Sequence, residues 1–188
     1  MHKHAVLLLI VSLLSSLCVG LVGPIYPIYV LKRFSATIID TGILYAIFCV
    51  VAAAFKAPAG RLVDVHGKTR VFLIGVVIGV VCTIGYVVAT SVFQLYLIEF
   101  LSGLSYALQR PALLALMADL STRKNRGFFM GLFDSTYDIA EAVAAVLSVF
   151  IVSQYGFEAL FFMCSGCQAA SGLLVLKSGG RKFRRLKA

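Results

Sequence analysis

Six long apolar runs alternate with short polar segments along the chain. They cover residues 5–31, 39–59, 71–89, 92–120, 127–152 and 157–177, and a basic tail follows over residues 178–188. A helix needs ~20 apolar residues to cross the hydrocarbon core of a bilayer, and each run is close to that length or longer. No segment between the runs is long enough for a soluble domain. The pattern therefore predicts an all-α membrane protein, with residues 1–177 forming one domain of six transmembrane helices.

The lysine and arginine residues are distributed unevenly between the two sides of this predicted bundle. If the N-terminus is inside, only Lys32 and Arg33 fall on the outer side. The inner set is Lys3, Arg61, Lys68, Arg70, Arg123, Lys124, Arg126, Lys177, Arg181, Lys182, Arg184, Arg185 and Lys187. Cytoplasmic loops carry the excess of basic residues in membrane proteins. We therefore expect a multi-pass protein of the cell (plasma) membrane with both termini in the cytoplasm.

The composition excludes an ordinary soluble domain. Of the 188 residues, 61% are hydrophobic, and the mean hydropathy is +0.98, whereas soluble domains are about half apolar. The net charge of +9 could indicate a nucleic-acid partner, but most basic residues lie in the loops and the tail. There they fit an anionic membrane surface. The expected partner is membrane lipid and not nucleic acid.

The chain shows no residue pattern typical of an enzyme or a metal site. Its histidines lie outside the apolar runs, and no span contains a Ser–His or Glu-x-x-His arrangement. The five cysteines lie inside the runs, where cysteine usually packs as a small apolar residue. Cys164 and Cys167 share a helical face, but no other His or Cys is near them in sequence, and zinc needs about four ligands. We expect no catalytic residue, metal or cofactor.

The polar segment between the second and third runs is short and rich in glycine and charge. It reads Gly-Arg-Leu-Val-Asp-Val-His-Gly-Lys-Thr-Arg from Gly60 to Arg70. This segment resembles the signature loop of the major facilitator superfamily, roughly Gly-x-Leu-Ala-Asp-Arg-x-Gly-Arg-Lys-Arg, although Val65 replaces a basic residue. The matching residues are Gly60, Leu62, Asp64, Gly67, Lys68 and Arg70. Six matches between two predicted spans are a specific signal, and glycine permits the sharp turn that the loop requires.

A second pattern resembles the superfamily around the next polar segment. Asp119 closes the fourth run and Arg126 precedes the fifth. In the family, such an acid interacts with the basic end of the signature loop, so we expect Asp119 to pair with Lys68 or Arg70. The resemblance implies a role in conformational gating for Gly60, Asp64, Gly67, Lys68, Arg70, Asp119 and Arg126.

Three acids lie in the fifth run, at Asp134, Asp138 and Glu141. Their spacings of four and three residues place them on one face of a helix. The cost of a carboxylate in lipid requires that face to point inward. At ~1.5 Å per residue, Arg110 lies about 13 Å from the inner end of the fourth run, between the depths of Asp134 and Asp138. We therefore expect Arg110 to pair with Asp134 or Asp138.

One arginine cannot neutralise three acids. At least one acid should therefore bind a proton or meet a cation, and the best candidate is Glu141, with Glu99 of the fourth run near its level. At Glu99 the sequence departs from the superfamily, which usually has an arginine before the glycine-rich run of its fourth span. The alternative is a buried structural network of charges that does not titrate.

Two other polar positions in the apolar runs have two interpretations each. Pro24 bends the first run near its outer end. Tyr26 beside it would either line a cavity or belong to an aromatic belt at the membrane interface. Lys56, near the inner end of the second run, is expected to extend to the lipid headgroups rather than to contact a substrate.

The resemblance implies an architecture larger than this chain. Members of the superfamily contain two six-helix units, each built from two inverted three-helix repeats (3+3), with the substrate site between the units. This chain has one unit, which alone would expose its acidic face to lipid. We therefore expect a homodimer or a pair with a different half-transporter. Asp64 would then lie at the start of the partner's fifth span, near Gly127 and Phe128.

The function implied by the resemblance is secondary active transport by alternating access. We expect it to be coupled to protons and to move a small cationic or zwitterionic, amphipathic solute. The candidate residues for binding the substrate and the proton are Glu99, Arg110, Asp134, Asp138, Glu141 and Tyr26. The alternative function is a membrane scaffold or accessory subunit that does not transport.

Overall fold

The structure is a computed structural model that describes residues 2–121 and 125–179, and its regular elements are all α-helices. They are α1 (His2–Val22), α2 (Tyr26–Phe34), α3 (Ile38–His66), α4 (Lys68–Val88), α5 (Val92–Leu120) and α6 (Arg126–Gly179). The predicted all-α fold is confirmed for these ranges. Arg123, Lys124 and the predicted tail beyond residue 179 lie outside the described residues.

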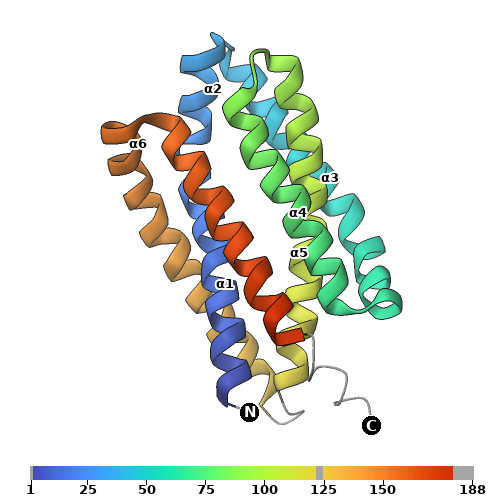
Figure 1. Cartoon of the computed structure of the whole chain (residues 1–188). Helices are drawn as coiled ribbons and strands as arrows, with labels where there is room; N and C mark the ends of the chain where they lie inside the picture. Colours follow the sequence, from blue (N-terminus) through green and yellow to red (C-terminus); the bar gives the residue numbers. More distant parts are fainter. Residues whose placement is uncertain (1, 122–124, 180–188) are drawn as a thin grey trace.

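Helix α6 consists of two legs that meet at Gly156. Gly156 has φ +80° and ψ 178°, a conformation outside the helical region that glycine adopts without a steric cost. The chain reverses there, so residues 126–155 form a first leg and residues 157–179 a second leg that runs back beside it (Figure 1). The pattern of apolar runs predicted a boundary between the fifth run (residues 127–152) and the sixth run (residues 157–177), and Gly156 lies between them.

The first apolar run is broken into α1 and α2. The break covers residues 23–25, and the two helices are bent by 43°. Pro24 has no N–H to donate to the preceding turn, so α1 cannot continue through it. Pro27 lies in the first turn of α2, where a missing N–H costs little. The predicted proline bend is confirmed.

Helices α3 and α4 are joined by the single residue Gly67. Its φ is +94°, and its N–H donates to the Val63 carbonyl at 3.0 Å, closing the last turn of α3. The prediction that Gly60 belongs to the turn is wrong, because α3 continues through it to His66. The connection between α3 and α4 therefore needs the special backbone freedom of glycine only at Gly67.

The packing order brings helices distant in sequence together. Helix α3 packs on α5, and α4 packs on both α5 and α6. Helix α1 contacts both legs of α6, since Gly20 lies against Glu141 of the first leg and the Cys18 thiol donates to the Cys164 carbonyl of the second. Figure 1 shows α1 running along the two legs of α6, with α3, α4 and α5 beside them.

Two apolar cores lie at opposite ends of the bundle. We call the end that contains α2 and the Gly156 turn the α2 end, and the other the Gly67 end (Figure 1). The core at the α2 end includes Tyr29 and Phe161, and the core at the Gly67 end includes Phe72 and Phe133, all fully buried. Large rings fill both ends, so the space left between them lies midway along the helices.

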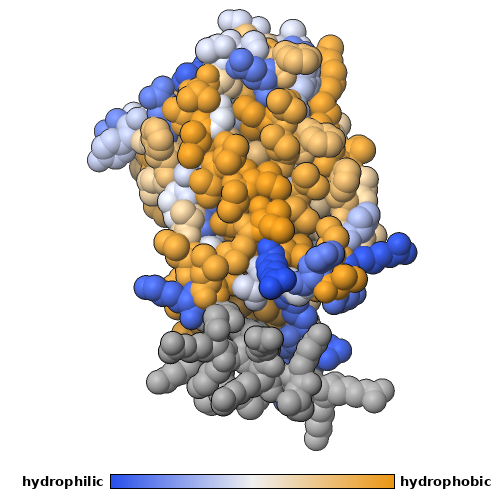
Figure 2. All heavy atoms as spheres, turned by 45° about the vertical axis from the view of Figure 1, so that its right-hand side comes forward, coloured by the Kyte–Doolittle hydropathy of each residue, from blue (hydrophilic) through white to orange (hydrophobic). Residues whose placement is uncertain are grey.

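The outer surface is apolar over most of the helix length. Among the described residues, α3, α4 and α6 are long and apolar enough to cross a membrane, and the bent pair α1–α2 would make a fourth crossing. Helix α5 is as long as α3, but Glu99, Gln109 and Arg110 lower its hydropathy. Figure 2 shows an apolar band with polar residues gathered toward both ends of the molecule. These features indicate a multi-pass membrane protein.

Candidate functional site

A cavity of about 920 Å³ opens between the helices, midway along the bundle. Residues from α1 to α6 line it, including both legs of α6. Its wall contains charged side chains, tyrosines and small polar residues in addition to apolar ones. Ligand sites typically have volumes of about 300–1,000 Å³ with a few polar groups on an apolar wall, so the cavity has the size and character of a ligand site.

Glu99 lies in the cavity wall toward the α2 end. Its side chain is 5% exposed and accepts a hydrogen bond of 2.8 Å from the Tyr86 hydroxyl. The Tyr86 hydroxyl is also 3.1 Å from the Ser102 hydroxyl. Glu99 makes no ion pair with any of the described residues. The carboxyl group is therefore buried with hydroxyl partners but without a cation.

Tyr26 lies beside this carboxyl group at the start of α2. It is 7% exposed and lines the cavity, and its ring packs edge-on against that of Tyr86 with centroids 5.6 Å apart. Its buried hydroxyl has no hydrogen-bond partner in the described part of the chain. Of the two interpretations of Tyr26, the cavity position is confirmed. A buried hydroxyl without a partner is costly, and this one lies next to the Glu99 carboxyl group.

The core at the α2 end holds Tyr86 in place. The Tyr29 hydroxyl donates to the Tyr86 carbonyl, and the Tyr86 ring stacks on that of Phe161 with centroids 5.1 Å apart. Tyr29 also packs edge-on against Phe161 and Phe157. The break after α1 thus directs α2 toward the aromatic core. This core holds the Tyr86 hydroxyl in the position from which it donates to Glu99.

Arg110 lies in the cavity wall closer to the Gly67 end. Its Nη2 atom donates to Asp134 Oδ1 at 2.9 Å, which confirms the predicted pairing. Its guanidinium lies 4.4 Å from the ring centroid of Tyr137 and 5.9 Å from that of Phe133. The Nη1 atom is buried and has no hydrogen-bond partner among the described residues. One nitrogen of the guanidinium is therefore packed against the rest of the bundle without a hydrogen bond to any described residue.

The three acids of α6 do not all face the cavity. Glu141 lines it and is half-buried, Asp134 is 49% exposed at its side chain, and Asp138 is exposed and absent from the cavity wall. The face of the first leg that packs on its neighbours is centred on Tyr137 and Ala144, so the acids lie at its edge. Asp138 is thus exposed in this single chain, the situation expected for a unit without its partner, and its inward orientation stays a prediction for the complete transporter.

Lys56 differs from its sequence prediction. Its ammonium lies 4.9 Å from the centroid of the Tyr106 ring on α5, and the residue lines the cavity. The aromatic face attracts the cation, and this attraction directs the side chain across the cavity rather than along the helix to the headgroups. The sequence could not show this contact, because nothing in it places Tyr106 within reach.

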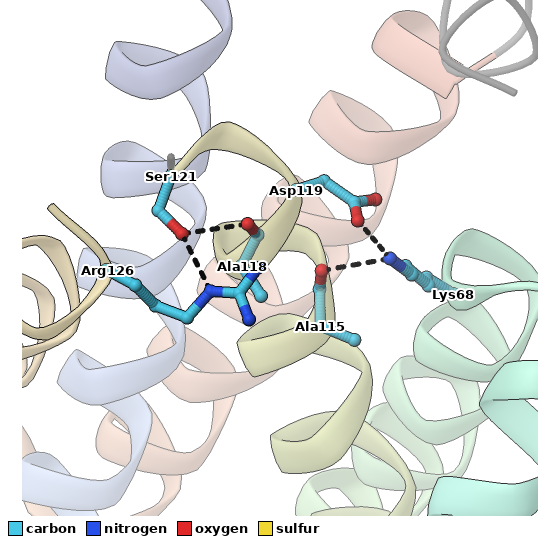
Figure 3. A network of polar contacts seen from close by, with 6 residues as sticks. All are labelled: Lys68, Ala115, Ala118, Asp119, Ser121 and Arg126. Carbon is cyan, nitrogen blue, oxygen red and sulfur yellow. Dashed lines mark hydrogen bonds and ion pairs between the residues drawn. The ribbon is translucent and has the colours of Figure 1, made fainter. Parts of the chain in front are cut away.

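A polar network at the Gly67 end joins α4, α5 and α6 (Figure 3). Lys68 Nζ donates to Asp119 Oδ1 at 2.5 Å and to the Ala115 carbonyl at 3.1 Å, which confirms the predicted Asp119–Lys68 pair. Arg126 Nε donates to Ser121 Oγ at 3.4 Å, and Ser121 Oγ donates to the Ala118 carbonyl at 2.8 Å. The network attaches both neighbouring helices to the last turn of α5.

Two other charged residues of the signature segment lie at the surface of this chain. Asp64 and Arg70 are exposed, and neither forms an ion pair within residues 2–121 and 125–179. Within the described residues, the position of the segment therefore depends on the turn at Gly67 and on the contacts of Lys68. The gating role of Asp64, Arg70 and Gly60 stays a prediction.

Sequence reasoning missed several residues of the cavity wall. Tyr86 and Ser102 contact Glu99 or its partner, and Gln168 has a buried side-chain oxygen without a partner in the described ranges. The one signal that the sequence offers for these residues is that each is a polar residue inside an apolar run. Many other polar residues occupy such positions, so this signal does not identify a cavity wall. In the described residues, no group of three or more His, Cys, Asp or Glu side chains could hold a metal ion.

Comparison with known proteins places the chain in a family. The sequence profile of the Major Facilitator Superfamily matches residues 8–184. The chain belongs to this superfamily. The resemblance carried by the signature segment is thus confirmed, and membership of this family of membrane transporters indicates a transporter and not an enzyme.

Two curated members of the superfamily show the extent of the similarity. The uncharacterized MFS-type transporter MJ1560 of Methanocaldococcus jannaschii is 23% identical over 164 residues, which cover 87% of this chain and 42% of the relative. The quinolone resistance protein NorA of Staphylococcus aureus is 27% identical over 152 residues, which cover 79% of this chain and 39% of the relative. The chain thus spans about two fifths of the length of these relatives.

Proposed function

We propose that this chain is one half of a secondary active transporter. The observation that carries the proposal is the cavity of about 920 Å³, in which Glu99 is buried without a cation, in a member of a transporter superfamily. Transporters of this kind bind their substrates near the bilayer midplane, at the interface between their units, and this cavity lies midway along the helices of one unit. The charged and polar groups in its mostly apolar wall suit a small cationic or zwitterionic, amphipathic solute.

In this proposal the helices make six crossings. The pair α1–α2 forms the first, α3, α4 and α5 the next three, and the legs of α6 the last two, arranged as two inverted triplets. The 54 residues of α6 exceed the length of one crossing, and its reversal at Gly156 supports two. Lys68, Arg70 and Arg126 at the Gly67 end support a cytoplasmic location for that end and for both termini of the unit.

A second unit completes the transporter in this proposal, and we favour a second copy of the chain over a different half-protein. The exposed Asp138 supports the need for a partner, since a carboxylate facing lipid costs several kcal/mol or more. Asp64, Gly127 and Phe128 are exposed as well. Asp64 of one unit at the N-terminus of α6 of the other would close the cytoplasmic side, with a dipole contribution of about 0.3–1 kcal/mol.

Proton coupling follows from the same charges. A carboxyl group in a membrane interior without a cation is most stable when it is protonated, and Glu99, Asp138 and Glu141 all lack an ion-pair partner among the described residues. Alternating access would expose the cavity to each side of the membrane in turn, so that one of these groups gains and then loses its proton. The Asp64 contact would break at each opening to the cytoplasm.

Uptake into liposomes tests this function. The purified protein would be reconstituted and given a pH gradient, with tetraphenylphosphonium and a quinolone as probes, the latter because NorA is named for quinolone resistance. We expect gradient-driven accumulation that falls at least tenfold in Glu99→Gln and in Asp138→Asn. Lys32→Gln, a change of an exposed lysine outside the cavity, should not alter it. If no probe accumulates and the variants behave as the wild type does, the scaffold alternative replaces transport.

A further inference from the structure

Four helices lie side by side along one face of the bundle. Helix α3 packs on α5, α5 contacts α1, and α1 packs on the first leg of α6, where Ser16 donates to the Tyr137 carbonyl and Gly20 lies against Glu141. All four helices line the cavity, so we call this side of the unit the cavity face. Helix α3 and the first leg of α6 lie at its opposite edges and do not pack closely on each other within the described residues (Figure 1).

The cavity is open at the cavity face. Several residues of its wall are exposed, and they belong to α1, α2, the break between these helices, and α3: Val19, Gly23, Pro27, Tyr45, Cys49 and Lys56. In a membrane, such an opening faces either lipid or a second protein. A charged side chain that faces hydrocarbon is costly, and Lys56 is one of the exposed residues. The cavity of one unit is therefore incomplete without a cover.

Lys56 lies at the α3 edge of this opening. Around the helix axis, Lys56 follows the buried Ala52 by about 40° and Cys49 follows it by about 60° in the same sense, and both lie on the exposed side of the wall. The ammonium group of Lys56 lies 4.9 Å from the centroid of the Tyr106 ring and makes no ion pair within the described ranges. An ammonium group has three donors, so the contact with one ring leaves it able to bind a carboxylate.

Asp138 lies at the opposite edge, on the first leg of α6. Around this leg, Glu141 lies about 40° and Asp138 about 100° from Tyr137 in the same sense. Tyr137 and Glu141 line the cavity, so Asp138 lies just beyond the end of the wall on the same side of the helix. It is exposed and forms no ion pair in the described part of the chain. The two edges of one opening thus contain a cation and an anion without an ionic partner.

A two-fold axis along the membrane normal brings the two edges together. Rotation by half a turn exchanges the edges of the cavity face, so α3 of one copy meets the first leg of α6 of the other. The same rotation keeps every residue at its depth. Lys56 is ten residues before the end of α3 and Asp138 is twelve residues after the start of α6, which places them about 15 Å and 18 Å along their helices from the Gly67 end. The flexible four-carbon stem of lysine can span that difference.

We propose that the cavity face is the interface between two copies of this chain, and that Lys56 of each copy binds Asp138 of the other copy. By symmetry the ion pair forms twice, once at each edge of the shared cavity. Asp138 of the partner copy then completes the cavity wall beside Lys56, and neither charge faces lipid. The inference rests on the proposed transport function, which requires two units, and it names the surface and the residues that join them.

The charges favour a second copy over the other covers. A symmetric interface must be complementary to itself, with each surface supplying both members of every contact. This chain supplies both Lys56 and Asp138, on opposite edges and at similar depth. Lipid tails offer no charged group at that depth, and a different half-protein would need its own matching acid and base. The second copy needs no residue that the chain does not already have.

Two charge reversals that rescue each other test the inference. Lys56→Glu and Asp138→Lys each place like charges opposite one another twice in a homodimer, so each variant alone should self-associate at least about tenfold more weakly than the wild type. A dimer of one chain of each kind has opposite charges at both contacts and should form as readily as the wild-type dimer. Energy transfer between differently labelled chains in a mild detergent measures all three associations.

The outcomes of this test are distinct. Failure of the two variants to associate with each other, with circular dichroism showing both to be folded, would overturn the inference. Wild-type self-association of either variant alone would overturn it as well. The control Lys32→Glu reverses an exposed lysine outside the cavity and should leave association unchanged. A complex of the chain with another protein, without any association between copies, would replace the second copy with a different half-transporter.

Chemical cross-linking of the wild-type protein needs no variant and decides the matter if a variant does not fold. A hydrophobic carbodiimide joins an ammonium group to a carboxylate in contact with it through an amide bond, with loss of water. We expect mass spectrometry to find a peptide that links Lys56 to Asp138 in the species with two chain masses and not in the single chain. A link from Lys56 to Glu141 in place of Asp138 would overturn the inference.

The result is separable from the test of transport. Rescue between the two reversed chains without uptake of any probe would support this interface and overturn transport. Gradient-driven uptake by a protein whose association ignores both reversals would overturn the interface and leave the transport proposal intact.

Discussion

Arg110 shows how a single residue connects the stability of the bundle with the cavity. Its guanidinium binds Asp134 of α6 and lies over the ring of Tyr137, and the residue also lines the cavity. The ion pair offsets the cost of placing an arginine inside an apolar bundle. The side chain of Asp134 is 49% exposed in the single chain, so the pair is only partly buried.

Asp134→Asn should destabilise the protein by removing the only acid that pairs with Arg110 in the described residues. We expect a loss of about 1–2 kcal/mol, between the values for exposed and buried pairs. The matched control is Glu158→Gln, which removes the acid of the Arg33–Glu158 pair. Glu158 is more exposed than Asp134, so this change should cost less than about 1 kcal/mol. Unfolding in detergent followed by circular dichroism measures both, and an equal effect of the two changes would contradict this account of Arg110.

Gly20 shows a residue-scale constraint of another kind. A Cβ atom at this position would lie 2.3 Å from the Glu141 carbonyl oxygen, so Gly20 allows α1 to approach the first leg of α6 closely. Close approach of helix backbones at small residues is a common way to pack helices in membranes. The contact also positions Glu141 at the cavity wall.

Gly20→Ala should therefore destabilise the protein by about 1–3 kcal/mol, because the helix backbones must separate to accept the methyl group. Gly131→Ala on the same leg of α6 is the control, since a Cβ there has no atom within 4 Å. It should be neutral or slightly stabilising through its higher helix propensity. The two unfolding midpoints in detergent provide the measurement, and a neutral Gly20→Ala would show that the packing is looser than described.

At the scale of elements, the chain direction changes at a few residues with unusual backbones. Gly67 and Gly156 have positive φ angles and connect helices that reverse direction, whereas Pro24 breaks α1 from α2. These breaks place α2 and the legs of α6 around the cavity. Most boundaries of these elements could be predicted, because glycine, proline and the ends of apolar runs are local signals. Gly60 was assigned wrongly to a turn because a helix tolerates glycine and the sequence alone does not distinguish the two settings.

Gly67→Ala should disturb the α3–α4 connection. An alanine at φ +94° is strained, which costs about 1–3 kcal/mol. Gly60→Ala is the matched control in the same signature segment, where the helical backbone and the open surroundings accept a Cβ atom. It should be neutral or stabilise α3 by up to about 1 kcal/mol. Thermal unfolding of the two variants compares them, and equal midpoints would refute the distinction between the two glycines.

At the scale of the whole molecule, a single chain leaves polar groups exposed along an otherwise apolar surface. Asp138 of α6 is exposed within the helical region, and Asp64 is exposed at the end of α3. The chain also spans about two fifths of the length of its curated relatives. A second unit that covers these acids would remove the energetic cost of exposing them to lipid.

The protein purified in a mild detergent should accordingly contain two units. With a chain mass of 20.3 kDa, light scattering combined with chromatography, or native mass spectrometry, separates one copy from two. We expect two copies, and Asp138→Leu should change the monomer–dimer equilibrium if Asp138 lies in the interface. A stable single copy in several mild detergents would contradict the homodimer, and a complex with another protein of similar size would support the different half-transporter.

The sequence by itself determined the all-helical membrane fold and the family, and it reduced each of two ion pairs to two possible partners. These results depend on local features, such as the length of an apolar run and the signature segment, and on the fixed rise of a helix, which placed Arg110 between the depths of Asp134 and Asp138. The tertiary structure decided which way side chains face around each helix. It directed Lys56 to Tyr106, Tyr86 to Glu99, and Asp138 away from the cavity. The rotation of a helix about its axis depends on its packing against partners distant in the chain, and no local pattern records it.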